Sequence, residues 1–179
     1  MVNEKEIIQA CIKNDRLAQK SLYESYSPVL FAIIKRYIKD VHISEDILID
    51  SFMKIFDHLK KFEGKGSFEG WMKRIAVNQC LMHLRKNNVF HLTIESDNIV
   101  LPFETQIEED IDFKTLLKVL DLLPVGYRTV FNLYVVEGYK HKDIAEELGI
   151  SINTSKSQLR LAKERLKKIL KQQQISITG

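Results

Sequence analysis

A series of cations and hydrogen-bonding side chains near the C-terminus has the types and the spacing needed to hold a polyanion. Residues 151–171 contain seven basic residues and a single acidic one, Glu164. Five of the cations follow one another at steps of four, three, four and four residues, which places them in one stripe on a helix. These cations are Lys156, Arg160, Lys163, Lys167 and Lys171. The stripe predicts a nucleic-acid-binding helix, with a solvated basic face as the alternative.

The segment that must position this helix has the layout of a helix-turn-helix. A short helix is expected over residues 141–148, and Gly149 supplies the turn because a left-handed backbone costs glycine little. Ser151 then caps a longer helix, which in this motif enters the major groove with its N-terminal residues against bases and phosphates. The side chains expected to make these contacts are Ser151, Asn153, Thr154, Lys156, Ser157, Gln158, Arg160 and Lys163.

An apolar stripe beside the basic one is expected to hold the longer helix to its domain. Its members are Leu159, Ala162, Leu166 and Ile169. The short helix is expected to turn Ile144, Ala145 and Leu148 inward. His141, near the start of that helix, is expected to be exposed.

A second group of aromatic and basic residues lies between residues 60 and 85. Three lysines stand in a loop over residues 60–66, and Ser67 is expected to cap the helix behind it. Rings on which bases stack, interleaved with lysines that meet phosphates, are typical of single-stranded nucleic-acid sites. The alternative is that Phe68 and Trp71 pack a hydrophobic core.

The remaining pattern is helical. Only 7 Gly and 3 Pro occur in 179 residues, and apolar residues recur at three- and four-residue steps. A stripe that begins at Leu17 is expected to be interrupted at Pro28, or Pro28 opens a further helix. Ser44 is expected to cap the next helix. A helix over about residues 124–137 is expected to end at Gly138.

The charges divide the chain into three parts. Residues 1–88 hold 15 basic and 11 acidic side chains, residues 89–112 hold 7 acidic and no basic ones, and residues 113–179 hold 12 basic and 6 acidic ones. The middle part also loses the helical periodicity and contains Pro102, so we expect a flexible acidic linker there. The sequence thus predicts an all-α protein of two helical domains, 1–88 and 113–179, with the helix-turn-helix in the second.

The composition argues against several classes of function. The longest apolar run, residues 29–34, is too short to span a bilayer, and the polar N-terminus has no signal core behind it. Two cysteines do not make a disulfide framework, so a cytoplasmic location is expected. No phosphate-binding glycine loop occurs, and Cys80 with His83 is only half of a zinc site. We therefore expect no enzymatic activity, no cofactor or metal, and no small-molecule substrate.

Taken together, these motifs resemble extracytoplasmic-function (ECF) sigma factors, the two-domain class of bacterial transcription initiation factors. The resemblance covers nearly the full length in the right order. The segments that carry it are residues 22–26, 45–52, 68–85, 123–131, 137–139 and 144–157. It implies that the chain binds core RNA polymerase and directs promoter-specific initiation. An anti-sigma factor is implied as a further partner.

The resemblance also implies roles for particular residues. Residues 1–88 would be region 2 and residues 113–179 region 4, whose helix-turn-helix would read the minus-thirty-five promoter element. The polymerase-binding residues of region 2 would be Asp46, Ile49, Asp50 and Phe52. Those at the minus-ten element would be Lys61, Lys65, Ser67, Phe68, Trp71, Lys73, Arg74, Asn78 and Arg85.

Three positions depart from the family pattern. Ile49 stands where Gln is usual, Met82 where Asp is usual, and Ser155 where Val is common. Two other readings stay open. One is a stand-alone helix-turn-helix regulator that binds DNA without polymerase, and the other is a helical adaptor whose basic faces meet acidic proteins.

Overall fold

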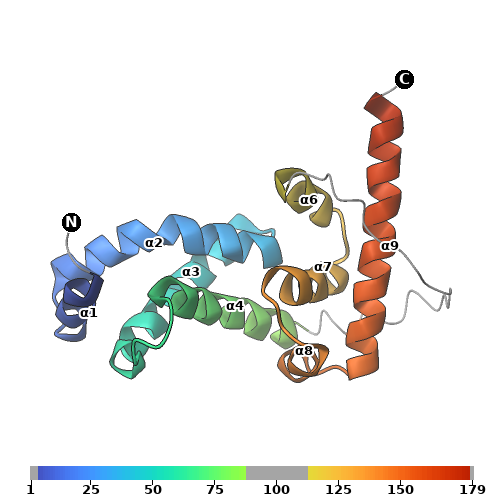
Figure 1. The fold of residues 1–179 in the computed structure, drawn as a ribbon. Coiled ribbons are helices and arrows are strands. Elements are labelled where there is room, and N and C mark those ends of the chain that lie inside the picture. Colours follow the sequence, from blue (N-terminus) through green and yellow to red (C-terminus); the bar gives the residue numbers. More distant parts are fainter. Residues whose placement is uncertain (1–3, 88–112, 178–179) are drawn as a thin grey trace. The chain divides into compact units, whose positions relative to one another are not determined.

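The computed structural model describes residues 4–87 and 113–177, with side chains described for residues 4–87 and 116–171 (Figure 1). The described residues form helices, turns and loops without a strand, so the predicted all-α class is confirmed. The chain divides into two compact units after Met82, and each unit is described by itself. The predicted linker, residues 89–112, lies outside the described residues.

The first unit is a set of helices packed around one apolar core. Its elements are α1 (Glu4–Ile12), α2 (Arg16–Tyr37), α3 (Val41–His58), the short 3₁₀ turn η1 (Leu59–Lys61) and α4 (Phe68–Lys86), whose last turn continues past the division at Met82. Helix α2 contacts α1 and α3, and η1 closes against α1 and α3. The core side chains that are at most 1% exposed include Leu22, Leu30, Ile34, Ile55, Leu59, Met72 and Val77.

The long helix α2 begins at a clear cap and continues through a proline. Asp15 Oδ1 accepts hydrogen bonds from the backbone N–H groups of Leu17 (2.9 Å) and Ala18 (3.1 Å). This cap puts Leu17, the first residue of the predicted apolar stripe, in the first turn, where it is 80% exposed. Pro28 lies inside the helix rather than interrupting it. It is exposed, and water can therefore satisfy the carbonyl that loses its N–H partner.

Helix α3 starts one turn earlier than the sequence predicted. Asp40 is the N-cap, and its Oδ1 accepts a hydrogen bond from the Ile43 N–H at 2.9 Å. Ser44, the predicted cap, is instead fully buried inside the first turn. Its hydroxyl lies 2.6 Å from the Asp40 carbonyl and 3.2 Å from the Ile38 carbonyl. Ser44 therefore ties the helix start to the preceding loop.

The second unit is organised around its last helix. Its elements are α6 (Phe113–Leu120), α7 (Val125–Phe131), the π-helical turn η2 (Asn132–Val136), α8 (His141–Leu148) and α9 (Ile152–Ile177). Helices α6, α7 and α8 all contact α9, and Figure 1 shows α7 and α8 beside it. The predicted apolar stripe is confirmed for Leu159, Ala162 and Leu166, which are at most 7% exposed, whereas Ile169 is half-buried.

The turn η2 continues α7 with a wider spacing. The Glu137 N–H donates to the Asn132 carbonyl, five residues back, at 2.9 Å. Gly138 follows with a φ of 75°, a left-handed conformation that favours glycine, so the predicted helix end is confirmed. The wider turn leaves Tyr134 40% exposed, with its ring against α8.

Candidate nucleic-acid interface

The predicted helix-turn-helix is present and capped. Helix α8 ends at Gly149, whose φ of 66° and ψ of 34° are left-handed. Ser151 Oγ accepts a hydrogen bond from the Thr154 N–H at 2.9 Å and lies 2.8 Å from Thr154 Oγ1. The cap holds the first turn of α9, so Ser151 and Thr154 are both engaged within the motif.

The first turns of α9 present one polar face. Asn153, Lys156 and Ser157 are exposed, while Thr154, Arg160 and Lys163 are half-buried. Arg160 Nη1 is paired with Glu164 Oε1 at 2.8 Å, with both side chains about one quarter exposed. The face therefore offers an amide, an ammonium and a hydroxyl, which are the donors that suit bases and phosphates.

Gln158 does not lie on that face. Its side chain is 3% exposed, and both amide atoms are buried without a hydrogen-bond partner in the described part of the chain. It shares the inner face of α9 with Ser155, Leu159 and Ala162, all buried against the rest of the unit. Gln158 was expected from its residue type to contact DNA, but in this structure its side chain is buried.

His141 joins the two helices of the motif instead of standing exposed. Its Nδ1 lies 2.9 Å from the Oγ of Ser155, which is fully buried on α9. Its ring stacks on Tyr134, with centroids 4.5 Å apart and an interplanar angle of 23°. Burial lowers the pKa of His141, and the positive charges of Lys156 and Lys163 lower it further. The lowered pKa favours the neutral form of the ring beside the cations of α9.

In the first unit, a glycine-containing loop leads into α4. Gly64 and Gly66 have φ values of 70° and 96°, and the predicted cap at Ser67 is confirmed by a 3.2 Å hydrogen bond from the Gly70 N–H to its Oγ. Lys61 and Lys65 are exposed in or beside the loop. The left-handed glycines and the Ser67 cap therefore define the backbone of a loop that carries exposed cations.

Some of the cations in this unit form ion pairs with neighbouring carboxylates. Lys65 pairs with Glu63 at 2.6 Å, and Lys73 pairs with Glu69 at 2.5 Å. Arg74 and Arg85 are exposed on α4. Exposed ion pairs contribute little stability, so phosphates could compete for these lysines.

The aromatic residues beside the loop form a cluster. Phe68 is 1% exposed and lies between Tyr26, Phe62 and Trp71, with ring centroids 6.0, 5.1 and 5.7 Å away. For Phe68 the prediction of a core position therefore holds, and its ring is not available for a nucleic-acid base to stack on. Trp71 is half-buried.

Asn78 follows Trp71 on α4 by about two helical turns. It is half-buried, and its Oδ1 is buried without a hydrogen-bond partner among the described residues. A buried acceptor without a donor is costly. Among the described side chains of α4, the Oδ1 atom of Asn78 is the one buried polar atom without a hydrogen-bond partner.

The exposed face of α3 mixes acidic and apolar side chains. Asp46 and Asp50 are exposed, and Ile49 is 54% exposed. Phe52 points the other way: it is 3% exposed and its ring lies 4.7 Å from Tyr23. Phe52 therefore supports the helix rather than a partner surface. The sequence prediction also missed Met53, which is 59% exposed and would have been found by its four-residue step from Ile49.

Comparison with known proteins gives these surfaces a family. Residues 22–89 match the model of sigma-70 region 2, and residues 113–166 match that of sigma-70 region 4. The chain is 24% identical to the RNA polymerase sigma-H factor of Pseudomonas aeruginosa, covering 93% of each chain. It is 26% identical to the ECF RNA polymerase sigma factor SigW of Bacillus subtilis, covering 93% of this chain and 96% of SigW. The chain belongs to the ECF sigma factors.

A solved structure is similar in fold to this sigma factor. It is that of the sigma factor RpoE in complex with the anti-sigma factor NepR from Bartonella quintana, with a TM-score of 0.50 and 24% identity, over 85% of this chain and 96% of that one.

Among the described residues of the present chain, no helix combines the length and the hydrophobicity that spanning a bilayer requires. The same residues hold no group of three or more His, Cys, Asp or Glu that could bind a metal ion.

Proposed function

We propose that this ECF sigma factor binds core RNA polymerase and directs it to specific promoters for transcription initiation. The observation that supports this most is the capped helix α9, which presents Asn153, Lys156 and Ser157 outward in the unit that matches region 4. A region-2 unit precedes it in the chain, as initiation requires both a polymerase-docking and a DNA-reading part.

In the proposed division of labour, residues 113–179 read the minus-thirty-five element as duplex DNA. Asn153 and Ser157 contact bases, and Lys156 contacts a phosphate. Arg160 and Lys163 lie further along α9 and add charge beside the groove. Ser151 and Thr154 keep the first turn in place through their hydrogen bonds.

Residues 1–88 are proposed to handle the minus-ten element. Lys61 and Lys65 meet the phosphates of a single strand, and the accessible part of Trp71 stacks on a base. The remaining contacts of this surface are Ser67, Lys73, Arg74, Asn78 and Arg85. Removing a base from the duplex costs a few kcal/mol, which the phosphate contacts and polymerase binding would offset.

The exposed face of α3 is proposed to dock on core polymerase. Ile49 and Met53 supply an apolar centre, and Asp46 with Asp50 supply charge at its edge. Interfaces of this kind have an apolar core and a polar rim. Residues 89–112, between the two parts, would act as the connector.

The proposed role needs no catalysis by this chain, because polymerase carries out the chemistry. It places the protein in the cytoplasm, where core polymerase and promoters are. An anti-sigma factor is a proposed further partner, since the Bartonella quintana sigma factor was solved in complex with one. That partner would cover the docking or DNA-reading surfaces.

Runoff transcription tests the proposal. Core polymerase, with and without this protein, is given genomic fragments, and specific transcripts are expected only with both. The Asn153→Ala variant serves as a matched control that retains core binding but has a relaxed preference at one base position of the promoter. A protein that binds duplex DNA tightly alone, yet neither associates with core polymerase nor directs transcripts, would be a stand-alone regulator instead.

A further inference from the structure

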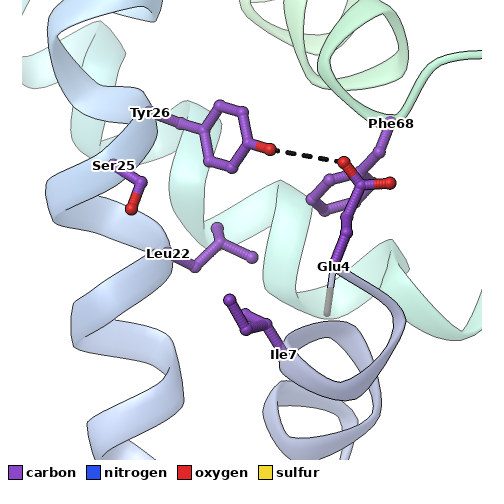
Figure 2. Close-up of a pocket in the computed structure, with 6 residues that line it drawn as sticks. All are labelled: Glu4, Ile7, Leu22, Ser25, Tyr26 and Phe68. Carbon is purple, nitrogen blue, oxygen red and sulfur yellow. Dashed lines mark hydrogen bonds between the residues drawn. The ribbon is translucent and has the colours of Figure 1, made fainter. Parts of the chain in front are cut away.

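A cavity of about 160 Å³ opens in the first unit between α1, α2 and the start of α4 (Figure 2). Its lining residues are Glu4, Ile7, Leu22, Ser25, Tyr26 and Phe68. A single water needs roughly 10–15 Å³ of such space, whereas drug-sized ligands occupy about 300 Å³ or more. The cavity is therefore of a size for one side chain or a small organic ion.

The polar end of the cavity is the carboxylate of Glu4. Figure 2 shows it directed at the hydroxyl of Tyr26 and beside the ring of Phe68. The Tyr26 hydroxyl donates to Glu4 Oε2 at 3.4 Å, which is long for a hydrogen bond between two oxygens. Among the described residues no cation pairs with Glu4. Its carboxylate is thus able to accept further donors.

The walls are aromatic and the floor is aliphatic. The rings of Tyr26 and Phe68 meet edge to face, with centroids 6.0 Å apart and an interplanar angle of 88°. Ile7 and Leu22 complete the lining beneath them. Aromatic rings attract cations, and aliphatic surface suits the methylene stem of a long basic side chain.

The charges near the cavity favour a cation over an anion. Burial raises the pKa of Tyr26, and the charge of Glu4, their hydrogen bond and the charge of Glu69 raise it further. The hydroxyl thus lies in a negative potential. Ser25 does not reverse it, because its hydroxyl donates to the Ser21 carbonyl at 2.7 Å and is left as an acceptor.

We propose that this cavity binds a guanidinium or ammonium group carried on an aliphatic chain. Glu4 accepts the donors of the cation, Tyr26 and Phe68 flank it, and Ile7 and Leu22 contact its stem. Two sources share this chemistry: an arginine or lysine side chain of a protein partner, or a free alkylguanidine or alkylamine. The site uses none of the residues proposed above for DNA or polymerase.

A titration of the full-length chain, followed by NMR of labelled backbone amides, tests the site. The probe is N-acetyl-arginine amide, and the neutral isostere N-acetyl-citrulline amide is its control. Saturable shifts are expected at the lining residues, with binding of citrulline weaker by about two- to fivefold, since its urea still donates to the exposed Glu4 carboxylate but the attraction between opposite charges is lost. Absence of saturable binding, or equal binding of citrulline, would overturn the proposal.

Substitution locates the charge. The Glu4→Gln variant is expected to lose about as much affinity for the arginine probe as the citrulline exchange costs. The matched control is Glu6→Gln, an exposed carboxylate on the same helix that does not line the cavity. Circular dichroism establishes that both variants fold. Unchanged binding by Glu4→Gln would also overturn the proposal.

Two further probes separate the sources. Agmatine presents the guanidinium on a free small molecule, and the peptide Gly-Arg-Gly presents it within a backbone. Tighter binding of agmatine supports a free ligand, and tighter binding of the peptide supports a partner side chain. Either result supports the shared chemistry, and failure of both to bind contradicts it.

Discussion

His141 Nδ1 and Ser155 Oγ lie 2.9 Å apart, so one hydrogen bond joins the first residue of α8 to the buried face of α9. Ser155 is also the position in the recognition helix where the family commonly has Val. A polar pair thus joins α8 to α9 at this position. The bond is confined to the second unit and can be tested there.

Removing the hydroxyl should weaken that unit. The Ser155→Ala variant is expected to lose about 1 kcal/mol of unfolding free energy, because His141 loses its partner in a half-buried place. Urea unfolding followed by circular dichroism measures the loss. Fluorescence of Trp71, the single tryptophan, reports the first unit and should not change. Ser157→Ala, an exposed hydroxyl on the same helix, is the control, and an equal loss there would contradict the prediction.

The stability of the second unit should fall in acid because of His141. Its pKa is lowered in the folded state, so between the folded value and about 6.5 the unfolded chain binds more protons. Its contribution is therefore fully present above pH 6.5 and is lost as the pH falls through the folded pKa. Urea midpoints at several pH values should show this dependence, and His141→Gln should show a smaller one. Identical pH dependence in the two proteins would refute the assignment to His141.

Gln158 should be replaceable without loss of DNA recognition. Gln158→Met keeps the length of the side chain and removes two buried polar atoms that have no partner in the described part of the chain. The melting temperature is expected to stay the same or rise. Promoter affinity of the polymerase holoenzyme should stay within about twofold, since burial already keeps the side chain from the groove. A large loss of promoter affinity with normal folding would show that Gln158 turns outward on DNA.

Substitutions of Asn153 and Lys156 should have different effects on DNA binding. Asn153→Ala should cost about 1–3 kcal/mol at the matching promoter and relax the preference at one base position. Lys156→Ala should weaken binding to all sequences and reduce the salt slope by about 1. Holoenzyme affinities for matched and scrambled duplexes at several salt concentrations separate the two effects. Lys168→Ala, exposed further along α9, serves as the control.

Charge on α3 should matter for polymerase but not for folding. The double variant Asp46→Lys with Asp50→Lys is expected to weaken core polymerase binding by about tenfold or more, because like or unpaired charges at an interface are costly. Glu24→Lys, an exposed carboxylate on α2, is the matched control. Competition binding against labelled protein measures both. Equal affinity of the double variant and the control would place the docking surface elsewhere.

Local signals in the sequence predicted the helix-turn-helix well. Gly149 and Ser151 each determine the backbone at their own position, so the turn and the cap did not depend on distant contacts. The cap of α3 was harder, because Asp40 and Ser44 are both good caps within one turn. Burial of Ser44 decides between them, and burial depends on how α3 packs on α2.

The face of a helix that a polar residue occupies was the weakest prediction. Gln158 has the chemistry of a base-reading residue, but its phase on α9 turns it toward the core. Phe52, which the helical pattern places among buried residues, and Phe68, for which a core position was the alternative, are both buried beside other rings. His141 was predicted to be exposed because it lies near a helix start, but its partner Ser155 lies fourteen residues away in the sequence. Such pairs follow from tertiary packing, which periodicity alone does not give.

The π-helical turn η2 also makes the second unit sensitive to chain length. Each residue added to or removed from Asn132–Val136 turns the following segment by about 100° about the helix axis. A one-residue deletion there would leave composition and hydropathy almost unchanged, yet would carry Tyr134 off the face that stacks on His141. Insertions and deletions should therefore be rarer across this turn than across the loop containing Gly64 and Gly66. The number of residues in this turn should therefore be under stronger selection than the types of side chain that it contains.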